Sequence, residues 1–267
     1  MTSVEQTIQD AKADGRAALV GYLPAGFPTV ARSIDLARAM VDAGVDVLEI
    51  GLPYSDPVID GPTIQAAAEV ALAGGTRVSD VFRVVEALAE RAPTLVMTYW
   101  NPVERYGVER FAAALDDAGG AGLITPDLIP DEAAGWTSAA DAHSLDKVFL
   151  VAPSSTEERL AFAAGSCRGF VYATAVMGVT GTRTATSDAA PVLVKRVRAV
   201  TDLPIGVGLG VSNGRQACEV ASYADAVIVG SAFVAEVQRA DSDTAARRGV
   251  ADLSADLARG VRRELCG

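Results

Sequence analysis

Two carboxylates near a proline-rich loop are the side chains of this sequence best suited to acid–base chemistry. Residues 45–50 alternate between two faces, so Glu49 shares an apolar face with Val45 and Val47. Burial of this kind raises the pKa of a carboxyl towards the range in which it can both give and take a proton. Asp60 follows within the loop, in a different environment. We expect one acid to move protons while the other holds a cationic or N–H group.

Both acids also have a purely structural interpretation. A glutamate at the end of a strand can simply pair with an arginine or lysine from elsewhere in the fold. The dipeptide Asp60-Gly61 is a common turn. The spacing of the two acids does not decide between these readings and the catalytic one.

Glycines at two later places predict a phosphate site. Residues 206–213 read GVGLGVSN, and Gly230-Ser231 follows about twenty residues later. Glycine lets backbone amides approach a ligand closely, and helices that begin near residues 213 and 231 would add positive dipole ends. The spacing is not that of a dinucleotide-binding G-x-G-x-x-G turn. The alternative is that these glycines only permit tight turns between strand and helix.

The stretch after Thr174 is long, polar and interrupted by glycines. Residues 175–188 read AVMGVTGTRTATSD, a composition typical of loops that close over a ligand and exclude water. A mobile surface loop is the alternative.

Eight apolar strands, each followed by a helical pattern, would position these residues. The strands are predicted at residues 17–23, 45–50, 94–99, 121–125, 147–152, 169–174, 203–208 and 225–229. Helices are predicted at residues 2–14, 29–43, 63–72, 108–118, 130–142, 189–200, 214–222 and 243–263, with two more opened by Ser79 and by a Ser155-x-x-Glu158 capping box.

A TIM barrel typically consists of eight strand–helix units in about 250 residues, which is the pattern predicted here. We therefore predict an α/β fold in which residues 1–267 form a single (β/α)8 domain. An extra helix at the N-terminus would close one end of the barrel, and long loops follow strands two and six. A doubly wound open sheet is the competitor, but it would show a glycine-rich turn after its first strand, and none follows Leu23.

Composition limits the partners and the chemistry. A net charge of −11 argues against nucleic acid and anionic membranes, and no apolar run approaches the roughly 20 residues of a membrane helix. Residues 1–14 do not resemble a signal peptide, so we expect a soluble, cytoplasmic protein. A single histidine excludes multi-histidine metal sites, and Cys167, Cys218 and Cys266 suggest neither a zinc site nor a disulfide framework. We expect Cys167 and Cys218 to be core-type residues and Cys266 a thiol.

Three motifs together resemble one family. They are EIGLPYSDPVIDGP at residues 49–62, Tyr172 followed by GVTG at 178–181, and GLG at 208–210 with Gly230-Ser231. From about residue 17 to about residue 235, this order of motifs is similar to the alpha subunit of tryptophan synthase. The first motif is highly specific, whereas the glycine motifs alone would not be.

The resemblance implies a lyase, acting in tryptophan biosynthesis, that splits indole-3-glycerol phosphate into indole and glyceraldehyde 3-phosphate without a cofactor. It implies that Glu49 shuttles the proton, and that Asp60 accepts the indole N–H and stabilises its developing positive charge. Tyr172 would lie beside Glu49, and Thr180 would reach Asp60. Two further sets of residues follow from the family. The indole slot would be Tyr22, Met97, Ile124, Leu150 and Leu209, and the phosphate would be held by Gly181, Gly208, Gly210, Gly230 and Ser231.

The resemblance also implies a partner. The family pairs with a beta subunit that carries pyridoxal phosphate (PLP), receives indole by substrate channelling and makes tryptophan, in an α2β2 heterotetramer. The residues expected on the docking face are Tyr54, Asp56, Pro57, Asn101 and Pro102. Ile59, Ala175 and Leu209 depart from the commonest pattern of the family, which bears on the fit of the pocket and the coupling of the loops more than on the reaction.

Two other functions remain open from the sequence. One is a different phosphate-binding barrel, an isomerase or an aldolase, although a Schiff-base aldolase needs a lysine at a strand end and Lys12, Lys147 and Lys195 do not lie there. The other is a regulator that activates a partner enzyme without catalysis, a reading that the presence of both Glu49 and Asp60 argues against.

Overall fold

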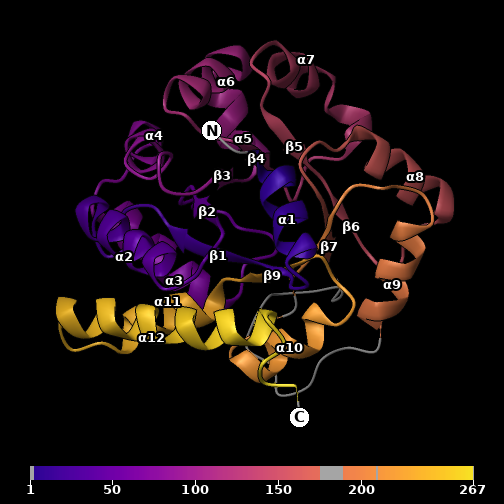
Figure 1. Ribbon diagram of the computed structural model, residues 1–267. Helices are drawn as coiled ribbons and strands as arrows, with labels where there is room; N and C mark the ends of the chain where they lie inside the picture. The colour runs from indigo at the N-terminus through magenta and orange to yellow at the C-terminus, as the bar shows by residue number, and fades with distance from the viewer. Residues whose placement is uncertain (1–2, 175–188, 209, 267) are drawn as a thin grey trace.

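Parallel strands wound around a common axis form the centre of the molecule (Figure 1). The structure is a computed structural model, which describes residues 3–174, 189–208 and 210–266. Each neighbouring pair of strands is parallel, in the order β5-β4-β3-β2-β1-β9-β8-β7-β6. The strands are β1 (Ala18–Pro24), β2 (Val47–Gly51), β3 (Thr94–Met97), β4 (Gly122–Ile124), β5 (Asp146–Val148), β6 (Leu150–Val151), β7 (Val171–Thr174), β8 (Ile205–Gly208) and β9 (Ala226–Val229).

The eight predicted strands appear as nine in the described part of the chain because one of them is divided at Phe149. The first piece, β5, pairs with β4, and the second, β6, pairs with β7. The Phe149 carbonyl accepts a hydrogen bond from the Tyr172 amide at 3.2 Å, so the backbone leaves one neighbour and joins the other here. Together β5 and β6 occupy the place of one strand, and the prediction of a TIM barrel is confirmed.

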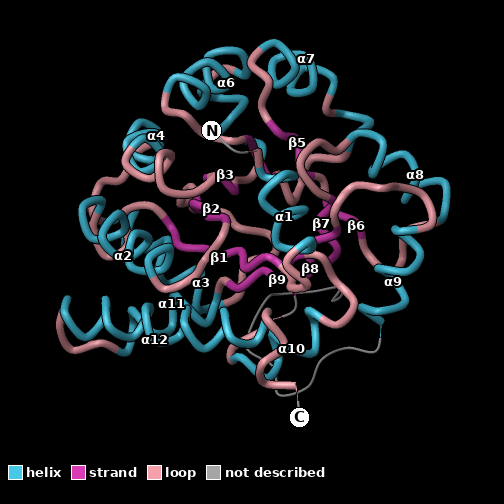
Figure 2. Tube along the Cα trace, viewed as in Figure 1, coloured by secondary structure: helices cyan, strands magenta, loops and turns pink. Residues whose placement is uncertain are grey.

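Helices surround the strands, as Figure 2 shows. They are α1 (Val4–Ala13), α2 (Val30–Asp42), α3 (Pro62–Ala73), α4 (Val78–Glu86), α5 (Trp100–Tyr106), α6 (Val108–Asp117), the 3-10 helix η1 (Pro130–Glu132), α7 (Ala134–Ala142), α8 (Glu157–Ser166), α9 (Ala189–Arg198), α10 (Gly214–Ala221), α11 (Ser231–Arg239) and α12 (Asp243–Val261). The short helix α5 was not predicted, and residues 130–142, predicted as one helix, are η1 followed by α7. In this described part of the chain, no helix is both long enough and apolar enough to span a membrane.

Two predicted helix starts were wrong, each by one or two residues. The hydroxyl of Thr156 accepts the Arg159 amide at 3.3 Å and caps α8, while Ser155 accepts the Ala152 amide instead. Helix α4 begins after Arg77, whose amide donates to the Asp80 carboxylate at 3.0 Å. In both cases the sequence offered neighbouring polar residues, and the backbone geometry selected a different one.

Alternation along the strands creates two apolar layers. One layer lies between the strands and the surrounding helices. The other fills the barrel interior, where inward side chains meet three residues of α1, the helix that lies across the barrel in Figure 1 and closes its end as predicted. This inner cluster comprises Val4, Ile8, Ala11, Ala18, Val20, Val47, Leu95, Ile124, Val148, Phe170, Ala226 and Ile228. Val45 belongs instead to the outer layer, because it precedes β2 and lies in the turn that ends α2.

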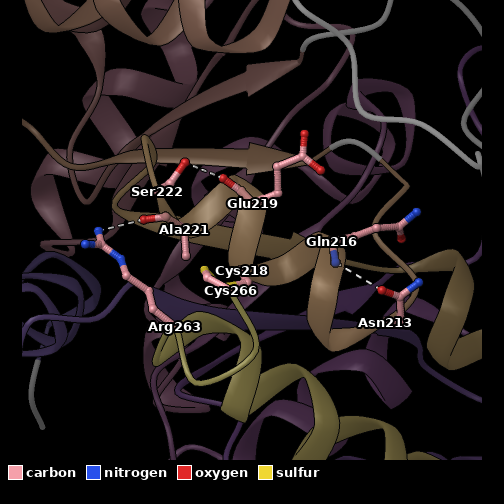
Figure 3. Close-up of a disulfide and its surroundings, with 8 residues drawn as sticks. All are labelled: Asn213, Gln216, Cys218, Glu219, Ala221, Ser222, Arg263 and Cys266. Carbon is pink, nitrogen blue, oxygen red and sulfur yellow. Dashed lines mark hydrogen bonds between the residues drawn. A yellow bond between two sulfur atoms is a disulfide. The ribbon is translucent and has the colours of Figure 1, made fainter.

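A disulfide joins Cys218 of α10 to Cys266 near the C-terminus, and the expectation of no disulfide was wrong (Figure 3). The chain after α12 runs back across α10, where the Arg263 guanidinium donates to the Ala221 carbonyl at 2.9 Å. This return brings the Cα atoms of the two cysteines to 5.8 Å, within the usual range for a disulfide. A separation of 48 residues gave no sign of the pairing. Cys167 is free and half-buried.

Candidate active site

A pocket of about 600 Å3, part of it open to solvent, lies at the C-terminal ends of the strands. Both predicted acids contribute to it, as do residues from five other strands and from helices α3 and α11. The described lining residues are Tyr22, Glu49, Ile59, Asp60, Ile64, Met97, Tyr172, Gly208, Gly210, Ile228, Gly230 and Ser231. This end of the barrel is where TIM-barrel enzymes carry out their chemistry.

Glu49 is held rigidly at the bottom of this pocket. It lies in β2 in register with Tyr22 of β1 and Leu95 of β3, and it is 1% exposed. No described residue hydrogen-bonds to its Oε1 atom. Burial raises the pKa of the Glu49 carboxyl from 4.5 to about 8. A carboxyl with that pKa holds its proton near neutral pH and can give it to a substrate and take one back.

Two half-buried tyrosines flank Glu49. Burial raises the pKa of Tyr22 well above 10.0, and the neighbouring charges of Asp60 and Glu49 raise it further. Burial also raises the pKa of Tyr172, with smaller contributions from Glu49 and Tyr22. Both phenols therefore stay neutral. Their hydroxyls lie over glycines, since a Cβ at Gly208 would be 2.5 Å from the Tyr172 hydroxyl. Glycine at the end of β8 is what leaves room for this ring.

Asp60 is the more accessible acid, on the loop between β2 and α3. Burial raises the pKa of its carboxyl, while a hydrogen bond from the Tyr99 hydroxyl acts in the opposite direction. The Asp60 carbonyl accepts the Gln65 side-chain amide at 2.7 Å. The two acids thus differ in backbone support and in solvation, as predicted from their positions in the sequence.

The end of β8 and the start of α11 form the predicted phosphate end of the pocket. Gly210 has a φ of 73°, a left-handed conformation that strongly favours glycine. Gly230 stands at the N-cap of α11 without a side chain to cap it, and Ser231 is the first residue of that helix. Uncapped amides at a helix N-terminus are suited to a phosphate. Neutral donors of this kind can bind an anion in a chain of net charge −11.

Five predicted pocket residues are not among the described lining. Ile124 of β4 belongs to the inner apolar cluster, and Leu150 of β6 packs against it. Thr180, Gly181 and Leu209, together with Ala175 and the rest of the predicted closing loop, lie outside the described residues.

Two apolar lining residues were missed by sequence reasoning, and a third was noted only as a departure from the family. Ile228 could have been found by alternation, because it lies two positions before Gly230 on the inward face of β9. Ile64 lies in the first turn of α3, directly after the loop that carries Asp60. Ile59, the departure, precedes Asp60 and lines the pocket with it. Together these residues give the pocket an apolar wall.

Two of the residues predicted to meet a partner, Tyr54 and Asn101, are in contact, and the other three are their neighbours in the chain. Asn101 donates to the Tyr54 hydroxyl at 3.0 Å, which joins the loop after β2 to α5. Asp56 and Asn101 are exposed, and Pro57 and Pro102 are half-buried. Val58, which was not predicted, is 73% exposed between them and Asp60.

Among the residues described, no three His, Cys, Asp or Glu side chains form a group that could hold a metal ion.

Comparison with known proteins gives one answer throughout. The sequence model of the family described as "Tryptophan synthase alpha chain" matches residues 8–261. The tryptophan synthase alpha chain of Acidothermus cellulolyticus is 61% identical over 264 residues, covering 98% of each chain, and that of Thermobifida fusca is 60% identical over 267 residues with the same coverage. A solved chain of Mycobacterium tuberculosis tryptophan synthase superposes with a TM-score of 0.92 at 52% identity, covering 98% of this chain and 99% of that one.

Proposed function

This chain belongs to the tryptophan synthase alpha chain family, and from that membership we propose that its pocket cleaves indole-3-glycerol phosphate into indole and glyceraldehyde 3-phosphate. The observation that carries the proposal is Glu49, a buried carboxyl with an unpartnered oxygen in the same pocket as the glycine-rich phosphate end. A carboxyl of raised pKa in the same pocket as a phosphate site is suited to transfer a proton to a phosphorylated substrate.

Glu49 would act twice in one turnover. Its carboxyl gives a proton to the indole ring carbon that carries the glycerol phosphate chain. The resulting carboxylate then takes the proton of the adjacent side-chain hydroxyl as the carbon–carbon bond breaks. The hydroxyl carbon becomes the aldehyde, the bonding electrons return to the ring, and Glu49 regains its proton. A pKa of about 8 suits both halves of this exchange.

Asp60 would support the same step electrostatically. Protonation of the ring carbon places positive charge on the indole nitrogen, and the carboxylate accepts the N–H as that charge develops. A fixed charge aimed at a developing one is worth a factor of about 100 to 1000 in rate. The indole ring would lie between the tyrosine pair and the apolar wall. That set is Tyr22, Ile59, Ile64, Met97, Tyr172 and Ile228.

The phosphate group would lie at the other end of the pocket. Gly208, Gly210, Gly230 and Ser231 line it, and the first amides of α11, which begins at Ser231, would bind the phosphate there. Of the predicted residues outside the described part, we retain Gly181 as a phosphate ligand and Thr180 as a contact of Asp60. We also retain Leu209 as part of the apolar slot for indole, with Ile124 and Leu150 behind it.

Membership of the family implies a beta subunit as partner. We further propose an α2β2 tetramer in which PLP is bound by the beta subunit alone. The docking face would be Tyr54, Asp56, Pro57, Asn101 and Pro102, with the exposed Val58 added. The single domain of residues 1–267, the absence of a cofactor on this chain and the cytoplasmic location stay predictions.

The test is the release of indole from indole-3-glycerol phosphate, with and without a beta subunit. We expect Glu49→Gln to abolish cleavage and Asp60→Asn to lower kcat about 100- to 1000-fold, with the fold intact by circular dichroism. Glu69→Gln, on the exposed face of α3, is the matched control and should keep the wild-type rate. Cleavage by Glu49→Gln at the wild-type rate would remove the proposed mechanism.

The same assay separates the two alternative functions. A chain that stimulates the beta subunit but releases no indole would be a non-catalytic activator. Loss of activity on borohydride treatment in the presence of substrate would show a Schiff-base aldolase instead.

A further inference from the structure

Asp60 and the predicted docking face are joined through one buried side chain, Tyr99. We propose that Tyr99 is a positioning residue that sets the Asp60 carboxylate and connects it to the surface formed by Tyr54 and Asn101. The inference rests on the proposed function, in which Asp60 holds the indole nitrogen.

The Tyr99 hydroxyl is an anchor for the loop that carries Asp60. It accepts the Ile59 amide at 3.1 Å, so it lies beside the residue that precedes Asp60, and it acts on the Asp60 carboxyl in the direction that lowers that group's pKa. A phenol has a single O–H to give, and here that proton can go to the carboxylate while an oxygen lone pair takes the backbone amide. One group thereby fixes the backbone before Asp60 and is placed to position its side chain. Three prolines, at residues 53, 57 and 62, supply no amide donors of their own to this loop.

Tyr99 itself is rigidly placed. It is 5% exposed and directly precedes α5. The next amide, that of Trp100, donates to both oxygens of Asp127 at 2.9 and 3.1 Å, which fixes the start of that helix against the end of β4. A residue held from both sides can impose a position on a proline-rich loop rather than follow it.

The other face of Tyr99 meets the docking surface. Its ring lies 5.4 Å from the ring of Tyr54, centroid to centroid, at an angle of 36°. The Tyr54 hydroxyl in turn accepts the Asn101 side-chain amide at 3.0 Å. Tilted aromatic pairs at this distance are attractive. A protein that binds over Tyr54 and Asn101 therefore contacts a pair of rings of which one holds Asp60.

The effect of the Tyr99 hydroxyl on the pKa of Asp60 can be measured. Burial raises the pKa of Tyr99 to about 12, so the phenol remains a donor throughout the range in which the enzyme can be assayed. Among the described residues, the other titratable groups near Asp60 are Glu49 on β2 and Tyr22 on β1, with Tyr172 beyond them on β7. Among these, Tyr99 is the one whose hydrogen bond lowers the pKa of Asp60. Removing it should raise that pKa.

The decisive variant is Tyr99→Phe, which keeps the ring and removes the hydroxyl. Tyr223→Phe is the matched control, because the Tyr223 hydroxyl is buried without a hydrogen-bond partner among the described residues and lies after α10, away from the pocket. We expect Tyr99→Phe to lower kcat about 10- to 100-fold, the range for a hydrogen bond to a charged group, with little change in KM. The acid limb of its pH–rate profile should move to higher pH. The control should match wild type in both.

A separate measurement tests the proposed connection between Tyr99 and the partner. At saturating beta subunit, the factor by which the partner stimulates cleavage should fall for Tyr99→Phe, while the affinity for the partner, measured by calorimetry, stays at the wild-type value because Tyr99 is buried. A stimulation factor and a pH profile equal to those of wild type would overturn the proposal. Asp60→Asn keeps the two proposals apart. If that variant is impaired and Tyr99→Phe is not, the positioning role alone fails, and if Asp60→Asn is fully active, the proposed function itself fails.

Discussion

Glu49 should make the stability of this protein depend on pH in a direction opposite to that of most acids. Its carboxyl titrates near 4.5 in the unfolded chain and near 8 in the folded one. Between these values the folded chain keeps a proton that the unfolded chain releases. The free energy of unfolding therefore falls as pH rises, by about 1.4 kcal/mol for each pH unit. From 4.5 to about 8 the loss amounts to roughly 5 kcal/mol, and it levels off above pH 8.

Replacing Glu49 with glutamine removes this titration. The amide brings a cost of its own, because the buried Oε1 position has no hydrogen-bond partner in the described structure. That cost is the same at every pH, so the informative quantity is the slope of the difference between variant and wild type. We expect the variant to gain on wild type by about 1.4 kcal/mol per pH unit between pH 5 and pH 8, while its cleavage activity is lost.

The assay is urea unfolding followed by circular dichroism at several pH values from 5 to 9. Equal m-values in the two proteins would show that the same surface is exposed on unfolding, so that the difference in midpoint reports stability. Glu69→Gln is the control, since Glu69 is exposed in the folded chain and meets water in both states. A difference between Glu49→Gln and wild type that stays constant with pH would refute the reasoning, because Glu49 would then be ionised in the folded chain.

Two further predictions concern the phosphate end and the disulfide. Gly210→Ala should weaken inhibition by inorganic phosphate and lower the free energy of unfolding by about 1–2 kcal/mol, since Gly210 has a φ of 73°. Gly165→Ala in α8 is the control, because a Cβ at Gly165 would meet no atom within 4 Å. It should leave the inhibition unchanged and should not lower stability. Cys266→Ser should cost about 2–4 kcal/mol of unfolding free energy, because the loop closed to Cys218 spans 48 residues. Dithiothreitol should bring wild type to the same midpoint and leave the variant unmoved, and a wild-type midpoint insensitive to the reductant would contradict this.

How far the sequence could predict the structure depended on whether the cause was local. Alternation and helix spacing are local, and they placed the barrel strands, the inward face of Glu49 and the closing helix α1. The disulfide of Cys218 and Cys266 was missed because it depends on the path of the chain after α12, which no pattern encodes. The division of one strand at Phe149 likewise depends on which neighbours its backbone meets.

The pocket shows the same limit. Glu49 and Asp60 could be picked out because carboxylates at such places are chemically conspicuous. Ile64 and Ile228 could not be distinguished by type from the many apolar residues of the core, and only their position at the end of the barrel makes them part of the site. The role of Tyr99 is still harder to predict, since it comes from a hydroxyl that contacts a loop 40 residues away in the chain.

The different supports of the two acids determine how a partner could control the reaction. Glu49 lies within β2, between two neighbouring strands, and the burial that sets its pKa is a property of the barrel itself. A protein docked at the surface cannot change that burial without disrupting the barrel. Asp60 lies on a loop anchored by the Tyr99 hydroxyl, which adjoins the docking face through the ring of Tyr54. Regulation by a partner should therefore act on the electrostatic step at Asp60 and leave the acidity of Glu49 unchanged.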